Sequence, residues 1–218
     1  MGKMTLPVSE IFYSIQGEGK LAGVPSTFVR LAGCPIQCPW CDTRYAWTLK
    51  NAKKIKIEEI IDIIRQYPAD HVVLTGGEPF IHPGIALLAH KLMQQQFHVT
   101  IETSGFIYRK VECHLLSLSP KLPNSVPHRI TFRPAILKRL ITSVPDYQIK
   151  FVVANLKEVC QVTDIIDEYP FINRANVMLM PNAKTLKRYI PLAPKIAQWA
   201  LLNKLKFCPR LHLELGIK

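Results

Sequence analysis

Short apolar runs alternate along the chain with longer segments in which apolar residues recur at the spacing of a helix face. Ile57, Ile60, Ile61 and Ile64 share one such face, which predicts a helix that packs on a sheet. This alternation is typical of βα units around a parallel sheet. We predict strands at residues 27–31, 71–75, 98–102, 115–118, 148–153 and 176–180. We predict helices at residues 57–66, 84–95, 133–141, 156–168 and 192–203.

Six strands are too few for a closed eight-fold barrel, so we expect an α/β fold: an open, partial βα barrel of about six parallel strands. The carboxyl ends of such strands meet at one face, where barrels keep their functional groups. Several prolines between residues 120 and 134 predict a surface loop before the third helix. No repeat or linker divides the sequence, so we expect residues 1–218 to form a single domain.

The formal net charge of +12 would suit an anionic partner, but the Lys and Arg residues are spread along the chain with only short doublets. We therefore favour a basic surface that attracts an anionic small molecule over one that binds nucleic acid. The sequence contains neither a long uninterrupted apolar run nor the pattern of a secretion signal. We expect a soluble, cytoplasmic protein that does not associate with a membrane.

Three of the six cysteines, Cys34, Cys38 and Cys41, lie close together just after the first predicted strand, which favours metal binding over a disulfide framework. Iron-sulfur clusters commonly take four thiolates, so a compact set of three suggests one iron left free for another ligand. The alternative is a closed zinc site completed by a distant residue such as Cys113 or His82.

The second predicted strand ends in Thr75, Gly76, Gly77 and Glu78. Two consecutive glycines at a strand end let the backbone approach a ligand closely, and Glu78 then offers a carboxylate. By itself, the same pattern also fits an ordinary turn between a strand and a helix.

Polar residues also end the next two predicted strands. Thr103 and Ser104 fit either a functional role or helix capping. The turn at residues 119–121 (Ser-Pro-Lys) presents a hydroxyl and a cation that suit a carboxylate or a ribose. Lys150 begins an apolar strand, and we expect it to be structural or exposed at the rim.

Taken together, these segments resemble a known family. The cysteine loop has the form CxxxCxΦC, with Trp40 as the aromatic residue Φ, and resembles the signature of the radical S-adenosylmethionine (SAM) superfamily. In chain order, EIFYSIQGEG, FVRLAGC, CPWCDT, LTGGEP, IETSG and SPK resemble the 7-carboxy-7-deazaguanine synthase family within it. The likeness runs from Glu10 to Lys121 and continues more weakly through IKFVV and LMP.

The resemblance implies which residues hold each ligand. Cys34, Cys38 and Cys41, in the loop 34–41, would bind a 4Fe-4S cluster and leave one iron for SAM. The residues implied to contact SAM are Trp40, Asp42, Gly76, Gly77, Glu78, Ser119, Pro120 and Lys121. Those implied to contact the substrate, several of them in the segment 8–24, are Ile15, Gln16, Gly17, Glu18, Arg30, Thr75 and, more weakly, His212. Thr43 matches the position that binds Mg²⁺ in the family.

The implied reaction is a radical ring contraction carried out by a carbon-nitrogen lyase. A 5'-deoxyadenosyl radical derived from SAM would take hydrogen from 6-carboxy-5,6,7,8-tetrahydropterin, which would become 7-carboxy-7-deazaguanine with release of ammonia. The pathway is queuosine and 7-deazapurine biosynthesis. A carboxylate and amides can read the aminopyrimidinone edge of a pterin, and Arg30 can pair with a carboxylate. The family also implies an external electron donor such as flavodoxin, and a homodimer.

The C-terminal tail departs from the family pattern. Many members end in a Gln-Thr-His-Lys or Trp-Gly-Asn-Lys-like segment that closes over the substrate, whereas this chain runs from Arg210 through His212 to Lys218. Two other functions share some of the features described above. A glycyl-radical-enzyme activase has the same cysteine loop but acts on a protein, and a zinc-stabilised RNA-binding module would suit the basic charge.

Overall fold

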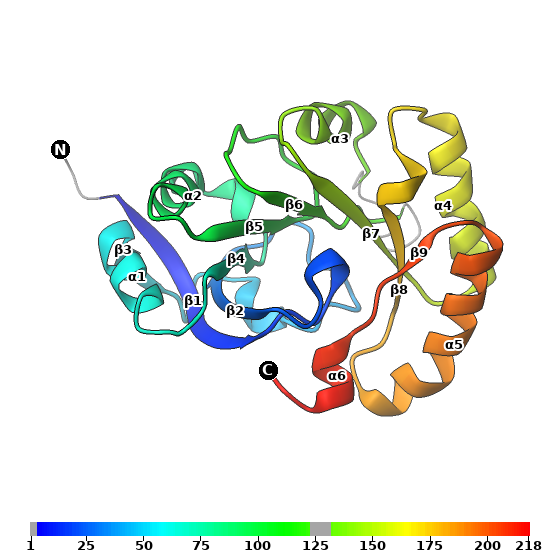
Figure 1. Cartoon of the computed structure of the whole chain (residues 1–218), viewed down its shortest axis with the longest axis horizontal. Coiled ribbons are helices and arrows are strands. Elements are labelled where there is room, and N and C mark those ends of the chain that lie inside the picture. The colour runs from blue at the N-terminus through cyan, green and yellow to red at the C-terminus, as the bar shows by residue number, and fades with distance from the viewer. Residues whose placement is uncertain (1–3, 123–131) are drawn as a thin grey trace.

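The computed structural model describes residues 4–122 and 132–218. They form one nine-stranded sheet in the order β3-β1-β2-β4-β5-β6-β7-β8-β9 (Figure 1). From β2 to β9 all neighbouring strands are parallel, whereas β1 pairs antiparallel with both β2 and β3. The sheet is open and does not close into a barrel.

The strands are β1 (Thr5–Ile15), β2 (Pro25–Leu31), β3 (Lys53–Lys56), β4 (His71–Gly76), β5 (His98–Thr103), β6 (Leu115–Leu118), β7 (Tyr147–Val153), β8 (Val177–Pro181) and β9 (Lys206–Phe207). The α-helices are α1 (Ile57–Ile64), α2 (Gly84–Gln94), α3 (Pro134–Ile141), α4 (Leu156–Glu168), α5 (Leu186–Leu202) and α6 (Leu211–Leu215). Short 3₁₀ helices cover Gly19–Leu21, Arg44–Ala46, Pro79–Ile81 and Arg174–Asn176.

The predicted α/β architecture is confirmed. The six predicted strands correspond to β2 and β4–β8, and the five predicted helices to α1–α5. The parallel part of the sheet has one more strand than predicted because the two residues of β9 add to its edge. The middle of the predicted proline-rich loop, residues 123–131, lies outside the described residues.

The N-terminal segment forms a strand, β1, that is not among the predicted strands. β1 is eleven residues long, and a shift of register between Val8 and Glu10 interrupts its pairing with β2. Leu6 and Val8 are buried, but the rest of the strand is largely half-buried on both sides. A strand without a clean alternation of buried and exposed positions gives a weak sequence signal.

Helix α5 begins at Leu186, six residues before the predicted start, which falls just after Pro191 although this proline lies inside the helix. A proline lacks the amide hydrogen of a helical bond and usually marks a helix boundary, which explains the error. Thr185 caps the true start, where its side chain accepts a hydrogen bond from the amide of Arg188.

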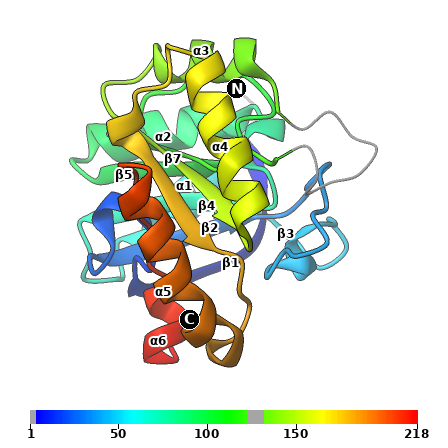
Figure 2. The same cartoon turned by 90° about the vertical axis from the view of Figure 1, so that its right-hand side faces the viewer.

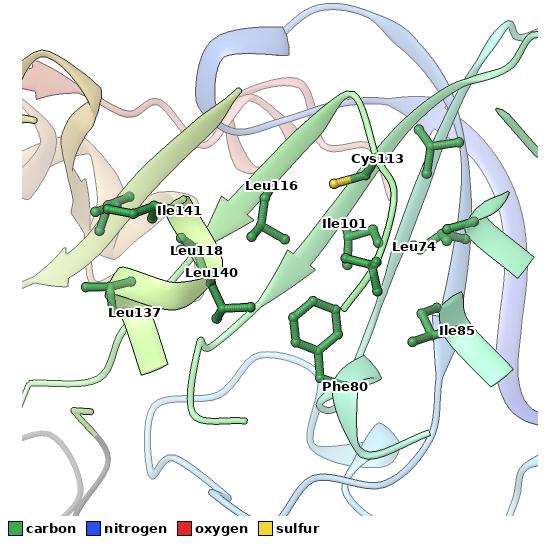
Figure 3. Packing of buried hydrophobic residues seen from close by; sticks show 14 of the residues in the cluster. Leu74, Phe80, Ile85, Ile101, Cys113, Leu116, Leu118, Leu137, Leu140 and Ile141 are labelled. Carbon is green, nitrogen blue, oxygen red and sulfur yellow. The ribbon is translucent and has the colours of Figure 1, made fainter. Parts of the chain in front are cut away.

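Helices lie along the outer side of the sheet, while α6 lies near the turn that joins β1 and β2 (Figures 1 and 2). The isoleucine face predicted for α1 is buried, as expected. Figure 3 shows the core between the strands and helices α2 and α3, where side chains of Leu74, Ile85, Ile101, Leu116, Leu118, Leu137 and Leu140 pack together. The helices of the described segments include none that is long and apolar enough to cross a membrane.

Candidate active site

A pocket of about 410 Å³ opens at the carboxyl ends of the parallel strands, within the size range of small-molecule sites. Of all the site residues predicted from the sequence, only Glu78 and Pro120 do not line it. The pocket brings together Ile15, Gln16, Gly17, Glu18, Arg30, Cys34, Cys38, Trp40, Cys41, Asp42, Thr43, Thr75, Gly76, Gly77, Ser119, Lys121 and His212. Residues far apart in the sequence therefore meet at one site.

The cysteine loop is anchored at its start by the backbone. The amides of Gly33 and Cys34 donate to the carbonyls of Ala46 and Trp47, at 2.8 and 3.0 Å. Within the loop, the amide of Cys41 donates to the carbonyl of Cys38 at 3.0 Å, which forms a tight turn around Trp40. These bonds place the three cysteines on one short, folded segment at the pocket wall.

The three loop thiols are free and lie in an apolar setting. Cys38 is buried, Cys34 and Cys41 are half-buried, and all three pack with Ile36, Trp40 and Phe106. Burial raises the pKa of both Cys34 and Cys38. The charge of Lys121 opposes this effect at Cys38 but does not outweigh it. Such thiols stay protonated until a metal replaces the proton.

The donor set fits an iron-sulfur cluster. Thiolates are the soft ligands that such clusters take, and each binds a different iron. Residues 4–122 and 132–218 include no group of three or more His, Cys, Asp or Glu side chains that could hold a metal ion by itself. Cys113 lies in the main apolar core, and His82 Nε2 lies 2.7 Å from the carbonyl oxygen of Ala32. Neither of these proposed zinc ligands lines the pocket.

The glycine turn after β4 makes direct contact with the start of the cysteine loop. The amides of Gly77 and Glu78 donate to the carbonyls of Leu31 and Gly33, at 2.9 and 2.8 Å. Gly76 has a φ of +151°, and a Cβ atom there would lie 2.2 Å from the Leu31 carbonyl oxygen. Both glycines are therefore required by close contact between two backbone segments.

Glu78 lies beneath the pocket. Its side chain accepts hydrogen bonds from the amide of Phe80 at 3.0 Å, from Thr103 Oγ1 at 2.6 Å and from the amide of Ser104 at 2.9 Å. The residue is 1% exposed. Thr103 and Ser104 thus join the end of β5 to the glycine turn through the Glu78 carboxylate.

A buried polar network lines the side of the pocket to which the N-terminal segment contributes Gln16 and Glu18. Lys150 Nζ lies 2.8 Å from Glu18 Oε2 and 3.2 Å from Glu102 Oε1. Gln16 Nε2 donates to Glu102 Oε1 at 3.3 Å, and Thr75 Oγ1 donates to Glu102 Oε2 at 3.1 Å. Of the two expectations for Lys150, a structural role or exposure at the rim, the second is wrong, because its side chain is 3% exposed and its charge is paired within the pocket.

The charges in this network perturb one another. Burial by itself would raise the pKa of Glu18, but the charges of Lys150 and Arg210 outweigh it and hold that pKa far below its usual range. Burial would lower the pKa of Lys150, but Glu102 and Glu18 raise it above its ordinary value. Glu18 and Lys150 are therefore an ionised pair at neutral pH.

Arg30 reaches the pocket from β2 and is held by Glu10 of β1. Arg30 Nε lies 2.8 Å from Glu10 Oε1, and the hydroxyl of Tyr45 donates to the same oxygen at 2.6 Å. The side chain of Lys218 also contacts Glu10. Burial would raise the pKa of Glu10, but its bonds to these three side chains hold the pKa below the ordinary value.

The C-terminal segment covers one side of the pocket. Arg210 donates to Glu18 at 3.3 Å and also bonds to Asp42 and to the carbonyl of Ala183. The amide of Leu211 donates to the carbonyl of Gly17 at 3.0 Å. His212 packs directly against Gly17.

Asp42 and Thr43 directly follow the cysteine loop, and both line the pocket. Thr43 precedes the 3₁₀ helix Arg44–Ala46, but its side chain makes no capping bond there. Its hydroxyl lies 3.5 Å from Cys41 Sγ instead. Asp42, in turn, is paired with Arg210 of the C-terminal segment.

Several polar residues of the pocket are not predicted from the sequence. They are Glu102, Ser117, Lys150, Asn182, Lys184 and Arg210. Glu102 ends a predicted strand beside Thr103, which is the signal that could have selected it. For the others, only the fold brings them to the pocket.

Comparison with known proteins gives consistent matches. Residues 29–177 match the model of the Radical SAM superfamily. The 7-carboxy-7-deazaguanine synthase of Halobacterium salinarum is 35% identical, over 96% of this chain and 90% of the relative. That of Hyperthermus butylicus is 37% identical, over 95% of this chain and 92% of the relative. The crystal structure of QueE from Escherichia coli superposes with a TM-score of 0.74 at 26% identity, covering 95% of this chain and 94% of that one.

Proposed function

The chain belongs to the radical SAM superfamily and, within it, to the 7-carboxy-7-deazaguanine synthases, and we propose that it carries out the ring contraction of 6-carboxy-5,6,7,8-tetrahydropterin to 7-carboxy-7-deazaguanine. The reaction releases ammonia and serves queuosine and 7-deazapurine biosynthesis. The observation that carries the proposal is the pocket itself. It joins the three loop thiols to Gln16 and Arg30 in one cavity of small-molecule size.

Cys34, Cys38 and Cys41 would hold the 4Fe-4S cluster, and the remaining iron would be open to SAM. When bound, these two groups supply a carbon-centred radical that can abstract hydrogen from a substrate. The apolar packing of Trp40 and Phe106 around the thiols would keep water from this centre. Lys121 approaches the Trp40 ring, with its Nζ 5.1 Å from the ring centroid, and supports a contact of both residues with SAM.

The chain's own residues would orient the pterin. Arg30 is fixed through Nε by Glu10, and its other nitrogens have no hydrogen-bond partner within residues 4–122 and 132–218, so they can pair with the substrate carboxylate. Gln16 and the ionised Glu18 line the pocket and suit the donors and acceptors of the aminopyrimidinone edge. Thr75 lies beside them and completes the set that we assign to the substrate.

Four finer assignments belong to the same proposal. The hydroxyl of Thr43 lines the pocket next to the cysteine loop, and together with the substrate carboxylate it would bind Mg²⁺, which favours hard oxygen ligands. A basic surface, with a net charge of +12, suits an acidic electron donor such as flavodoxin. The likeness to the family supports a homodimer, and the free thiols support a reducing, cytoplasmic setting.

The test is turnover by the intact enzyme. Anaerobically reconstituted protein, given reductant, SAM, Mg²⁺ and the carboxytetrahydropterin, should form the deazaguanine product and ammonia in equal amounts. A Cys38→Ala variant is the matched control, because it removes one cluster ligand from the same loop. An absence of product from wild-type protein with an intact cluster would overturn the proposal.

A further inference from the structure

Lys150 is a buried cation shared by two carboxylates. Its side chain is 3% exposed, and its neighbours in β7 are the buried, apolar Ile149 and Phe151. Its Nζ lies 2.8 Å from Glu18 Oε2 and 3.2 Å from Glu102 Oε1. Burying an ammonium ion is costly unless it is closely paired, so these distances show a specific arrangement and not a chance contact.

The two carboxylates come from distant parts of the chain and both line the pocket. Glu18 follows β1, and its other oxygen accepts from Arg210 Nε at 3.3 Å. Glu102 lies near the end of β5, and its other oxygen accepts from Thr75 at 3.1 Å. A carboxylate has about four acceptor positions, so each group keeps capacity to accept a further hydrogen bond from a ligand.

Two carboxylates so close to one cation would interact strongly if that cation were absent. Neighbouring carboxylates cannot both stay ionised at little cost, and the pKa of one of them rises until it holds a proton. A protonated carboxyl presents a donor where the ionised group presents an acceptor. The state of this pair therefore decides which ligand edge the pocket can receive.

We propose that Lys150 is a positioning residue that keeps Glu18 and Glu102 together as two ionised acceptors, so that the pocket selects the edge of a heterocycle that carries N–H donors. This rests on the proposed function, because the aminopyrimidinone edge of a pterin carries such donors. In this proposal Lys150 acts through the two glutamates that it pairs.

Other polar and charged groups face the same network from the elements around it. They are Arg210 and His212 at the C-terminal segment, Cys208 after β9, Gln16 after β1 and Thr75 in β4. Arg210 pairs only with the Glu18 side of the pair, so it does not replace Lys150 at Glu102. Burial lowers the pKa of His212, which leaves Lys150 as the cation shared by both carboxylates in the described part of the chain.

The experiment follows the ionisation of the pair in the cluster-loaded protein without substrate. Infrared difference spectra of protein with isotope-labelled glutamate would be recorded across pH for wild type, Lys150→Met, Lys150→Arg and Lys150→Met/Glu102→Gln. Only Lys150→Met should show a protonated glutamate band that titrates near neutral pH. Lys150→Arg keeps the cation, and the double variant removes the competing carboxylate, so both should resemble wild type. If Lys150→Met fails to fold, Lys150→Gln carries the same prediction.

Binding of the carboxytetrahydropterin by calorimetry supplies the second readout. Lys150→Met should weaken binding at least about tenfold near neutral pH, and its affinity should recover as pH rises and the extra proton leaves. A Lys150 variant that lacks the cation but shows no protonated glutamate would overturn the inference. Failure of wild-type protein to bind the pterin would refute the proposed function instead, since the infrared result does not depend on the substrate.

Discussion

A Cβ atom on Gly77 would lie 2.4 Å from the carbonyl oxygen of Gly33, closer than any side chain can approach a backbone. The glycine turn after β4 and the start of the cysteine loop are therefore in backbone contact. A hydrogen bond joins the same two segments, because the amide of Glu78 donates to the Gly33 carbonyl at 2.8 Å. The glycine turn thus helps to set the position of the three thiols.

Gly77→Ala should disturb the cysteine loop because neither backbone segment can move away cheaply. We expect the iron and sulfide content after anaerobic reconstitution to fall to less than about half that of wild type, with a lower melting temperature. Gly17→Ala is the matched control. Its added Cβ would meet the side chain of His212 at 2.5 Å, and that ring can move. A full cluster content in Gly77→Ala would show that the contact does not position the loop.

Arg210 ties the C-terminal segment to both sides of the pocket, through Glu18 and Asp42. Arg210→Gln should lower the free energy of unfolding by about 3 kcal/mol, the lower end of the range for a buried pair, because Glu18 keeps Lys150. It should also expose α6 to proteolysis. Asp42→Asn should have a smaller effect, since Arg210 keeps its other two partners. Chemical denaturation and limited proteolysis measure both, and equal effects of the two variants would argue against a central role for Arg210.

Glu10 should set the orientation of Arg30 for the substrate carboxylate. Glu10→Gln removes the charge that holds Arg30 Nε, and we expect KM for the pterin to rise about tenfold, the effect of losing about 1.4 kcal/mol. The value of kcat should change less, because the radical centre is untouched. Tyr45→Phe removes only one hydrogen bond to Glu10 and should change KM by much less. Steady-state kinetics with both variants would reveal whether Arg30 needs this support.

A group of histidines at the amino ends of the parallel strands, away from the pocket, should make the fold sensitive to acid. His71 bonds to Ser26 and Thr100 at 2.8 Å each and meets the ring of His98 edge-on, and burial lowers its pKa to about 4. In the unfolded chain His71 has an ordinary pKa near 6.5, so between about pH 6.5 and pH 4 it binds a proton in the unfolded chain but not in the folded one. The contribution of His71 to the free energy of unfolding is therefore complete above about pH 6.5 and is lost as the pH falls to about 4.

Thermal melts from pH 7 to pH 5 check this prediction. His71→Gln should lower the melting temperature at pH 7 but flatten its fall toward pH 5. The same change at His90, which is exposed and outside the group, should leave the fall in place. A His71→Gln slope equal to that of wild type would place the acid sensitivity elsewhere.

The regular part of the fold is predictable because its strands and helices have clear periodicity. The apolar runs of β4 and β7 and the isoleucine face of α1 each reflect burial that a local pattern reveals. β1 is not predictable in this way, because its side chains are half-buried on both faces. Helix α5 is only partly predictable, since Pro191 disguises its first turns.

The candidate site divides along a similar line. Cys34 and Gly77 belong to short motifs whose chemistry is visible in a few neighbouring residues. Lys150 and Arg210 have no such local signal, because both pair with Glu18, which lies 132 residues from Lys150 and 192 residues from Arg210 in the chain. A lysine in an apolar strand gives no sign of its partner until the fold brings Glu18 beside it.

The central claim is that three thiolates hold a cluster with one iron open to SAM. Electron paramagnetic resonance of the reduced, reconstituted protein, recorded with and without SAM, tests it most directly. We predict the signal of a single reduced 4Fe-4S cluster whose g values change when SAM is added, and no such signal in Cys34→Ala, Cys38→Ala or Cys41→Ala. A wild-type signal that SAM leaves unchanged, or a protein that binds zinc without iron, would contradict the account.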